Sequence, residues 1–285
     1  MLVIIGLVVV MGSVVAGYTM AHGNFAVLLQ WAEFVTIIGA AVGSLIVGSP
    51  IEVIKKVITA LLGTIKSDHL HKQDYLDILK SFNDLFLAAQ RDGLLSIEAH
   101  IEKPKESSIL SRNKKFIDNE YVTNYFCDTM KILLTGSVPP HELENIIDTE
   151  IESFEMENKP VGAAVSKMGD ALPGLGIVAA VLGIIITMSS IDKGAAYVGL
   201  HVAAALVGTF LGVLLSYGIV GPLAAKIEHD MEVKVRFLMT IKACIVAYAK
   251  GNPPIIAVEI ARRTIFSDFR PSFSELENYM RTKKE

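Results

Sequence analysis

The sequence predicts an all-α integral membrane protein, in which four transmembrane helices accompany a mostly helical cytoplasmic domain built from two chain segments. Of the 285 residues, 52% are hydrophobic and 20% charged, and the mean hydropathy is +0.47. That balance is unusual for a water-soluble protein. Four apolar stretches reach the roughly 20 residues that a helix needs to cross about 30 Å of hydrocarbon. They are residues 2–20, 27–48, 171–190 and 200–221.

The positive charges predict how the chain is oriented in the membrane. Residues 51–168 carry 14 of the 26 Lys and Arg and residues 223–285 carry 11, so both segments are expected on the cytoplasmic side, with both termini. No basic residue precedes the first apolar stretch, which favours a retained span over a signal peptide. The predicted organisation is spans one and two in 1–50, a helical domain in 51–168, spans three and four in 169–222, and a helical tail in 223–285.

Several functional classes lack their usual marks in this sequence. The net charge of -4 and the absence of a clustered basic stripe argue against a nucleic-acid partner. Cys127 and Cys244 lie far apart without metal-ligand spacing, so no metal site is expected. The chain contains no GxxxxGK[ST], GxGxxG, HExxH or GxSxG motif. We therefore expect neither catalytic residues nor a cofactor.

The polar segments contain amphipathic and charged stretches typical of helices. Helices are predicted over residues 68–91, 141–158, 223–250 and 254–265. Between helical stretches, Arg91 and Glu98 bracket a turn centred on Gly93. Judged from the residues alone, both are best explained as solvated surface charges.

Small residues form a stripe along the third span. Steps of three and four residues from Pro173 give Gly176, Ala180, Gly183, Thr187 and Ser190, and the fourth span repeats the pattern with Ala205, Gly208, Gly212 and Ser216, with Thr209 beside it. Such faces let helix backbones approach closely in lipid. Packing within the chain and packing on another chain both remain open. Pro173 is expected in the first turn of its span, where a missing N–H costs no hydrogen bond.

Ionisable residues avoid the centre of every predicted span. Glu33 and His201 are expected toward the external ends, and Asp170 toward the cytoplasmic end. A charged side chain at the bilayer centre costs about 2.5 to 3.5 kcal/mol on insertion scales, so such groups usually mark a transport path. If ions cross here, the hydroxyls of Thr187 and Thr209 are available, but the protonatable carrier must come from another chain. The sequence is that of half a channel.

Four separated segments resemble the MotA family of bacterial flagellar stator proteins. They read LPGLGIVAAVLG (172–183), ALVGTFLGVLLSYGIVGPLA (205–224), IEKPKES (101–107) and PPIIAVEIARRTIFSDFRPSFSELE (253–277). The resemblance covers essentially the whole chain, including the order of two spans, a large loop, two spans and a basic tail. One departure is Trp31, where many members have proline, and this puts the shape of that end of the second span in doubt.

The resemblance implies a multi-pass protein of the bacterial inner membrane, with five copies around two copies of MotB. MotB supplies the proton-accepting aspartate, and ion flow turns the ring against the rotor protein FliG. Carried over by motif, Arg91 and Glu98 become rotor contacts, which overturns the interpretation as solvated charge. Pro173 and Pro222 match prolines linked to torque, and Thr209 matches a threonine that lines the ion path.

The resemblance also bears on the transported ion. Sodium-driven relatives tend to have a threonine at the position of Ala180, whereas proton-driven relatives have alanine, so Ala180 favours H+ over Na+. Thr187, one step further along the stripe, weakens this preference because a hard cation demands oxygen ligands. Two alternatives are an energiser of another envelope machine, as in the ExbB/TolQ family, and a membrane scaffold that passes no ions. Proteins of the ExbB/TolQ family resemble three-span proteins, so the fourth span and the C-terminal tail of this chain argue against membership in that family.

Overall fold

The computed structural model describes residues 2–66 and 70–281, and within these ranges it is helical without a β-strand. The chain forms two compact units. One, called the apolar unit here, combines residues 1–68 and 157–231, and the other, the polar unit, combines residues 69–156 and 232–285. Four helices are long and apolar enough to cross a membrane. The predicted borders at residues 50, 168 and 222 refer to a bilayer surface and stay predictions.

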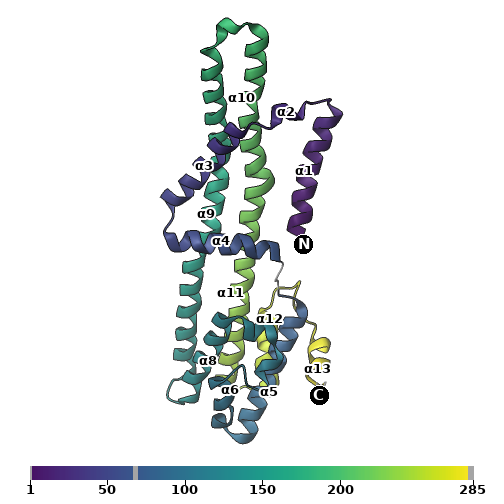
Figure 1. Cartoon of the computed structure of the whole chain (residues 1–285). Coiled ribbons are helices and arrows are strands. Elements are labelled where there is room, and N and C mark those ends of the chain that lie inside the picture. The colour runs from purple at the N-terminus through teal and green to yellow at the C-terminus, as the bar shows by residue number, and fades with distance from the viewer. Residues whose placement is uncertain (1, 67–69, 282–285) are drawn as a thin grey trace. The chain divides into compact units, whose positions relative to one another are not determined.

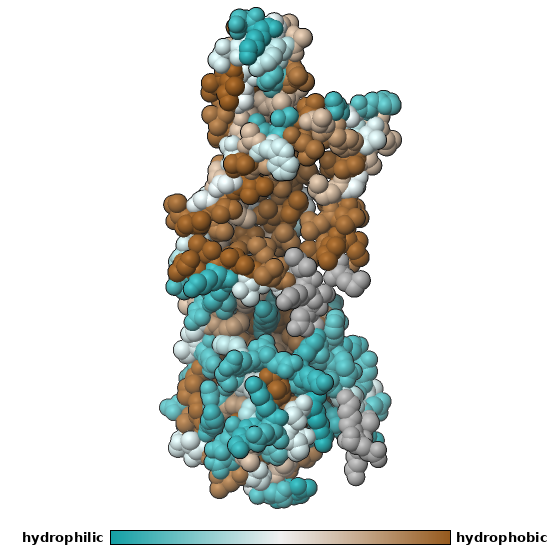
Figure 2. Space-filling view, in the orientation of Figure 1, coloured by the Kyte–Doolittle hydropathy of each residue, from teal (hydrophilic) through white to brown (hydrophobic). Residues whose placement is uncertain are grey.

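The apolar unit contains the predicted spans (Figure 1). Its elements are α1 (Leu2–Met20), α2 (Phe25–Leu28), α3 (Trp31–Gly48), α4 (Ile51–Lys66), part of α9 (Pro140–Met188), the 3-10 turn η3 (Ile191–Lys193), α10 (Ala195–Leu215), the π-helical turn η4 (Ser216–Val220) and part of α11 (Gly221–Ala249). None of the residues of α1 is buried. The surface over α3, α9 and α10 is largely hydrophobic (Figure 2).

The second span is found over Phe25–Gly48, but it is interrupted, so the expectation of one regular helix over residues 27–48 was wrong. Leu29 and Gln30 leave helical geometry, and the side-chain amide of Gln30 donates to the Val27 carbonyl at 3.0 Å, which gives a C-terminal carbonyl of α2 a partner. Helix α3 then begins at Trp31, the first helical position, where proline is also favoured. The proline found at this position in many members of the family would therefore also fit the start of α3, so Trp31 does not change where the helix begins.

Pro173 lies inside a helix, which corrects its predicted place in a first turn. Residues 140–188 form one 49-residue helix with Pro160 and Pro173 in its interior. A proline there has no N–H for the carbonyl four residues earlier, so the Gly169 carbonyl loses its usual partner. Sequence reasoning ended the polar helix at residue 158, before Pro160, but the helix continues through this proline into the span. The torque-coupling role of Pro173 stays a prediction.

Pro222 follows an irregular turn. The helix widens into the π turn at Ser216–Val220, and Pro222 is the second residue of α11. Residues 195–249 form one continuous helical stretch, so Pro222 lies inside it, and its missing N–H leaves a carbonyl of the preceding turn without its usual partner. The π turn directly before it changes the helical repeat, which makes room for the proline ring. The Pro222 side chain is exposed. Its predicted coupling role likewise stays a prediction.

Helix α4 packs within the apolar unit. Its Val57 is 2% exposed and joins a buried cluster with residues of α9 and α11, namely Val161, Ala164, Val165, Ala224 and Ile227. These side chains recur at three- and four-residue steps, which places them on one face of each helix. The amphipathic α4 is thereby fixed through its apolar face.

The polar unit is helical, as predicted. Its elements are α5 (Lys72–Asp92), η1 (Leu94–Ile97), α6 (Glu98–Glu102), η2 (Leu110–Arg112), α7 (Lys114–Asp118), α8 (Glu120–Leu134), the remaining parts of α9 and α11, α12 (Pro254–Thr264) and α13 (Phe273–Arg281). Helix α5 confirms the helix predicted over 68–91 from Lys72 onward, whereas Leu70 and His71 precede the helix and His71 is its N-cap. Residues 68 and 69 lie outside the described residues. Phe82 stacks on Phe126 with ring centroids 4.5 Å apart, and Phe116 meets both edge-on. This aromatic cluster supplies much of the buried core.

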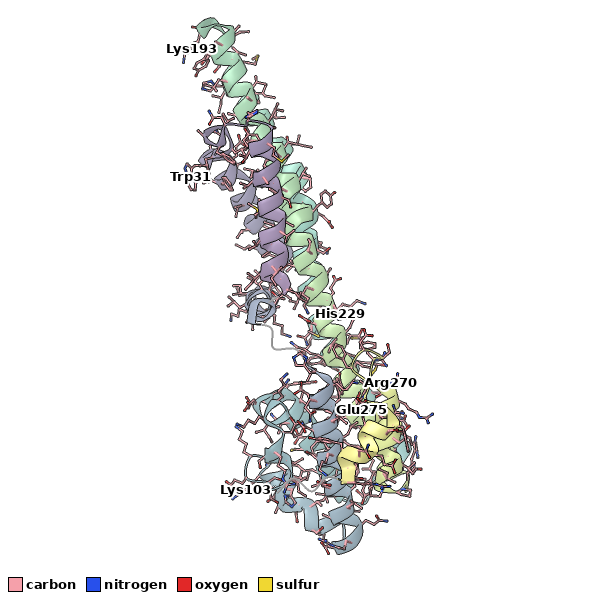
Figure 3. All side chains as sticks on the ribbon, turned by 90° about the vertical axis from the view of Figure 1, so that its right-hand side faces the viewer. Trp31, Lys103, Lys193, His229, Arg270 and Glu275 are labelled. Atoms are coloured by element: carbon pink, nitrogen blue, oxygen red, sulfur yellow. The ribbon has the colours of Figure 1, made fainter. Side chains whose placement is uncertain are left out.

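The C-terminal helices are held by charged contacts. Lys72 on α5 pairs with Glu275 on α13 at 3.2 Å, and Tyr279 donates to Asp77. Figure 3 labels Glu275 on α13. On α12, Glu259 receives hydrogen bonds from Arg262 at 2.6 and 2.8 Å. The α12 pair is shielded from solvent, because the Glu259 side chain is 13% exposed.

Stability is expected to depend on pH through Glu259. The hydrogen bond from Arg262 is the main reason why the pKa of Glu259 falls from 4.5 to about 2. The folded state therefore gains stability above pH 4.5 and loses it as pH falls toward 2. Glu259→Gln should lower the free energy of unfolding by about 2 kcal/mol at neutral pH, a typical value for a hydrogen bond to a charged group.

Unfolding of the purified full chain in detergent, followed from pH 7 downward, measures this difference. The gap between wild type and variant should narrow as the pH falls below 4.5. Glu277→Gln is the control, because Glu277 makes an exposed ion pair with Arg281 that contributes little. Identical pH profiles for the two variants would contradict the assignment.

Candidate functional site

Helices α9 and α10 form an antiparallel hairpin in which the backbones touch (Figure 1). A Cβ added at Gly176 would lie 2.6 Å from the Gly208 carbonyl oxygen, and one at Gly212 would lie 2.5 Å from the Leu172 carbonyl oxygen. Real Cβ atoms do not approach backbone this closely, so both positions require glycine. The small-residue stripe predicted from the sequence is confirmed as a packing face, and its partner is α10 of the same chain.

The other side of the hairpin is apolar and open. Ile177, Ile185 and Ile186 of α9 are 55%, 60% and 66% exposed. The turn at its end holds Lys193, and Trp31 projects from the start of α3 with 76% exposure (Figure 3). These surfaces are free to meet lipid or further protein chains.

The residues predicted to line an ion path meet at the hairpin. Ala180 and Thr187 are 5% and 2% exposed, while Thr209 is half-buried and follows Gly208. The Thr187 hydroxyl donates to the Gly183 carbonyl at 2.7 Å, so its proton is engaged by its own helix. Ala180 and Thr187 therefore lie at a contact inside one chain, whereas the sequence analysis offered Thr187 to a groove shared with another chain.

Glu33 is a buried acid in the first turn of α3. Its predicted position toward the external end of a span stays a prediction, but sequence reasoning missed that its side chain turns inward and is 9% exposed. Its Oε2 lies 2.5 Å from the position of a Cβ at Gly208, and its Oε1 lies 3.5 Å from that at Gly183. The signal was present in the sequence, because Ile37 and Ala41 follow at four-residue steps and both are buried.

Arg91 and Glu98 lie around a turn of the polar unit. Gly93 ends α5 with φ of 90°, a left-handed conformation that favours glycine. The Arg91 side chain is 78% exposed and pairs with Asp92 at 2.6 Å, and this hydrogen bond lowers the pKa of the Asp92 carboxyl. Glu98, the first residue of α6, is also exposed. The predicted turn is confirmed, and both charges face solvent.

No metal centre emerges from these side chains. In the ranges 2–66 and 70–281, no group of three His, Cys, Asp or Glu residues is placed to hold a metal ion. Both cysteines are free and buried.

Helices that are long and apolar enough to cross a membrane, packed through a glycine hairpin, are those of an integral membrane protein. Residues 4–93 match the family model "Motility protein A N-terminal", and residues 117–239 match "MotA/TolQ/ExbB proton channel family". The chain is 36% identical to motility protein A of Escherichia coli K12 over 284 residues, which cover 100% of this chain and 96% of that protein. It belongs to the MotA family.

Solved structures show the same fold. The structure of C. jejuni MotAB matches with a TM-score of 0.79 at 19% identity, covering 95% of this chain and 98% of that one. The flagellar MotAB stator complex from Bacillus subtilis matches with a TM-score of 0.74 at 21% identity, covering 96% and 98%. The fold therefore agrees with the family assignment along nearly the whole chain.

Proposed function

We propose that this chain is the MotA-type subunit of a flagellar stator, which assembles with a MotB-type partner and converts ion flow into torque on the rotor. The observation that carries the proposal is the end-to-end match to motility protein A of E. coli, at 36% identity over 100% of this chain. Both structural relatives are described as MotAB, and one as a flagellar stator complex. These likenesses favour a flagellar role over an ExbB/TolQ-like energiser or a scaffold.

The proposed location is the bacterial inner membrane, with both termini in the cytoplasm. The turn between α9 and α10 carries one basic residue, Lys193, whereas residues 223–285 carry 11 basic residues. This asymmetry supports a cytoplasmic tail and an external hairpin turn.

Self-association is also proposed, with five copies as in the family. The observation that supports assembly is the uncovered apolar surface: α1 has no buried residue, and Ile185 and Ile186 of α9 are more than half exposed. Lipid can cover part of this surface, but the family's ring provides the space for MotB, whose aspartate completes the ion path.

The transported ion is proposed to be H+ rather than Na+. Ala180 contributes only a methyl group to the hairpin, and the Thr187 hydroxyl proton is engaged by the Gly183 carbonyl. Sodium needs several oxygen ligands, which these positions of α9 supply poorly. Thr209 remains a candidate for lining the path, because it is only half-buried.

The rotor protein FliG is the proposed partner of Arg91 and Glu98. Both side chains are exposed on either side of the Gly93 turn, which leaves opposite charges available for pairing. Leu95 lies between them with 72% exposure and adds an apolar contact. Exposed charges steer association and set its specificity, as a transient contact with a moving rotor requires.

Complementation of cells that lack all stator genes tests the proposal. The chain should restore swimming when expressed with its MotB-type partner, and should fail alone or with a partner whose membrane aspartate is replaced by asparagine. Swimming speed should not depend on external sodium at fixed proton-motive force.

Swimming with this chain as the only stator protein would refute the need for the partner. A strong dependence on sodium would refute proton transport. Rescue of another envelope process, with swimming absent, would support the ExbB/TolQ alternative, and full assembly without any ion conduction would support the scaffold.

A further inference from the structure

The Glu33 carboxyl occupies an unusual position. Among the described residues, Glu33 is the one acidic or basic residue whose exposure falls to 9% or below. Its Oε2 is shielded from solvent and has no hydrogen-bond partner in the part of the chain that the structure describes. A buried polar atom without a partner costs free energy, and the cost is much larger when the group is charged, so this environment favours the neutral carboxyl over the carboxylate.

The surroundings offer no counter-charge to a carboxylate. Helix α3, helix α10 and residues 171–188 of α9 contain no Lys or Arg, and neither does α2. The titratable neighbours on α10 are Tyr197 and His201; His201 precedes Ala205 by one turn, and its ring stacks on Tyr197. The His201 Nδ1 lies 2.9 Å from the Tyr197 carbonyl, so it is engaged within α10. An ionised Glu33 would be a buried charge without a partner, which is costly in an apolar segment.

The shape of the site favours the smallest cation. Gly183 and Gly208 form a notch for the carboxyl, and a methyl group at Gly208 would already lie 2.5 Å from Oε2. The two glycine positions are also bordered by methyl groups, because a Cβ at Gly183 would lie 2.7 Å from the Ala205 methyl and one at Gly208 would lie 3.2 Å from the Ala179 methyl, and methyls are not metal ligands. A sodium ion would need several oxygens around it, whereas a proton needs one carboxyl oxygen.

The notch adjoins the candidate ion path. The same Cβ position at Gly208 lies 3.2 Å from the backbone nitrogen of Ala180. Gly208 is also the ninth residue of the span predicted over 200–221, well inside it rather than at its external end. Glu33 therefore reaches the interior part of another predicted span, a contact that its position along its own span did not reveal.

We propose that Glu33 is a proton-binding site of this chain, held protonated at neutral pH in the notch between Gly183 and Gly208. The reaction is protonation of the carboxylate by water-borne H+, with no other reactant. The role of this site in ion transport rests on the proposed function. If the chain is a stator subunit, Glu33 adds a proton-binding carboxyl on this chain's side of the ion path, beside Ala180 and in addition to the MotB aspartate.

Infrared spectroscopy of the purified full-length chain in lipid nanodiscs tests the site. The C=O stretching band of a protonated carboxyl should be present at neutral pH, shift in deuterated water, and disappear in Glu33→Gln. Glu52→Gln is the control, because Glu52 is exposed on α4 and its replacement should leave the band intact. Identical spectra of wild type and Glu33→Gln at neutral pH would overturn the proposal.

A second pair of variants keeps the test independent of the Glu33 side chain itself. Gly208→Ala places a methyl group against Oε2 and should shift the band, whereas Gly199→Ala on the same helix meets no atom within 4 Å and should not. An unshifted band in Gly208→Ala would place the carboxyl elsewhere and overturn the proposal. Because the measurement needs no motor, it decides on Glu33 even if the complementation experiment fails.

Discussion

Gly212→Val is expected to break the α9–α10 hairpin and abolish swimming. The first added carbon would lie 2.5 Å from the Leu172 carbonyl oxygen and 2.9 Å from the Gly176 Cα. Both are backbone atoms in helices, so they cannot rotate away as a side chain would. Overpacking usually lowers the free energy of unfolding by about 1 to 3 kcal/mol. Because the clashing atoms belong to the backbone, the loss for Gly212→Val should lie at or above the upper end of that range. Loss of the hairpin would also remove the notch that receives Glu33.

The amount of full-length protein in the membrane fraction, and its thermal unfolding in detergent, measure the effect. Gly199→Val is the matched control on the same helix, because a Cβ there meets no atom within 4 Å. It adds the same β-branched side chain and should accumulate and support swimming as wild type does. Equal accumulation and equal thermal stability of the two variants would contradict the close packing.

Arg91→Glu is expected to abolish torque while leaving the fold intact. The Arg91 side chain is 78% exposed and its ion-pair partner is the adjacent Asp92, so the change removes no buried contact. Its effect on the free energy of unfolding should be small, because substitutions of exposed side chains without buried contacts rarely change stability. A charge reversal at a contact surface, in contrast, replaces attraction with repulsion and slows or prevents association.

The swimming speed of complemented cells, compared with the amount of assembled complex in their membranes, measures this effect. Arg281→Glu is the control, since Arg281 is 77% exposed and also has one acidic partner, Glu277. Cells with Arg281→Glu should swim normally. Normal swimming with Arg91→Glu would remove Arg91 from the rotor contact, and failure of both variants would point to a general effect of charge.

Much of the architecture could be predicted because it follows from short-range patterns. Length and hydropathy identified the spans, and the steps of three and four from Pro173 identified the packing face of α9. The Gly93 turn followed from glycine between two helical patterns. The partner of the α9 face could not be predicted, since small residues permit close approach to any helix and specify none.

The remaining differences have separate causes. The burial of Glu33 depends on a contact distant in sequence, because Gly208 of another helix provides the space for its carboxyl. The break at Leu29 and Gln30 accompanies a local hydrogen bond from the Gln30 side chain to the Val27 carbonyl. Helix α9 continues through Pro160 and Pro173, which sequence reasoning read as a helix end and a helix start because prolines are common at both.

Helix α1 is apolar around its whole circumference and has no buried residue. Lipid therefore gives it a depth in the membrane but no preferred rotation about its own axis, since every side is equally suited to hydrocarbon. That preference comes from contacts within the chain, because half-buried residues recur along one side at Val3, Leu7, Val10, Val14 and Tyr18, and a Cβ at Gly218 would lie 3.1 Å from Val10. Substitutions on that side of α1 change packing against its own chain, whereas substitutions elsewhere on its circumference meet none of the described residues closely enough to be buried.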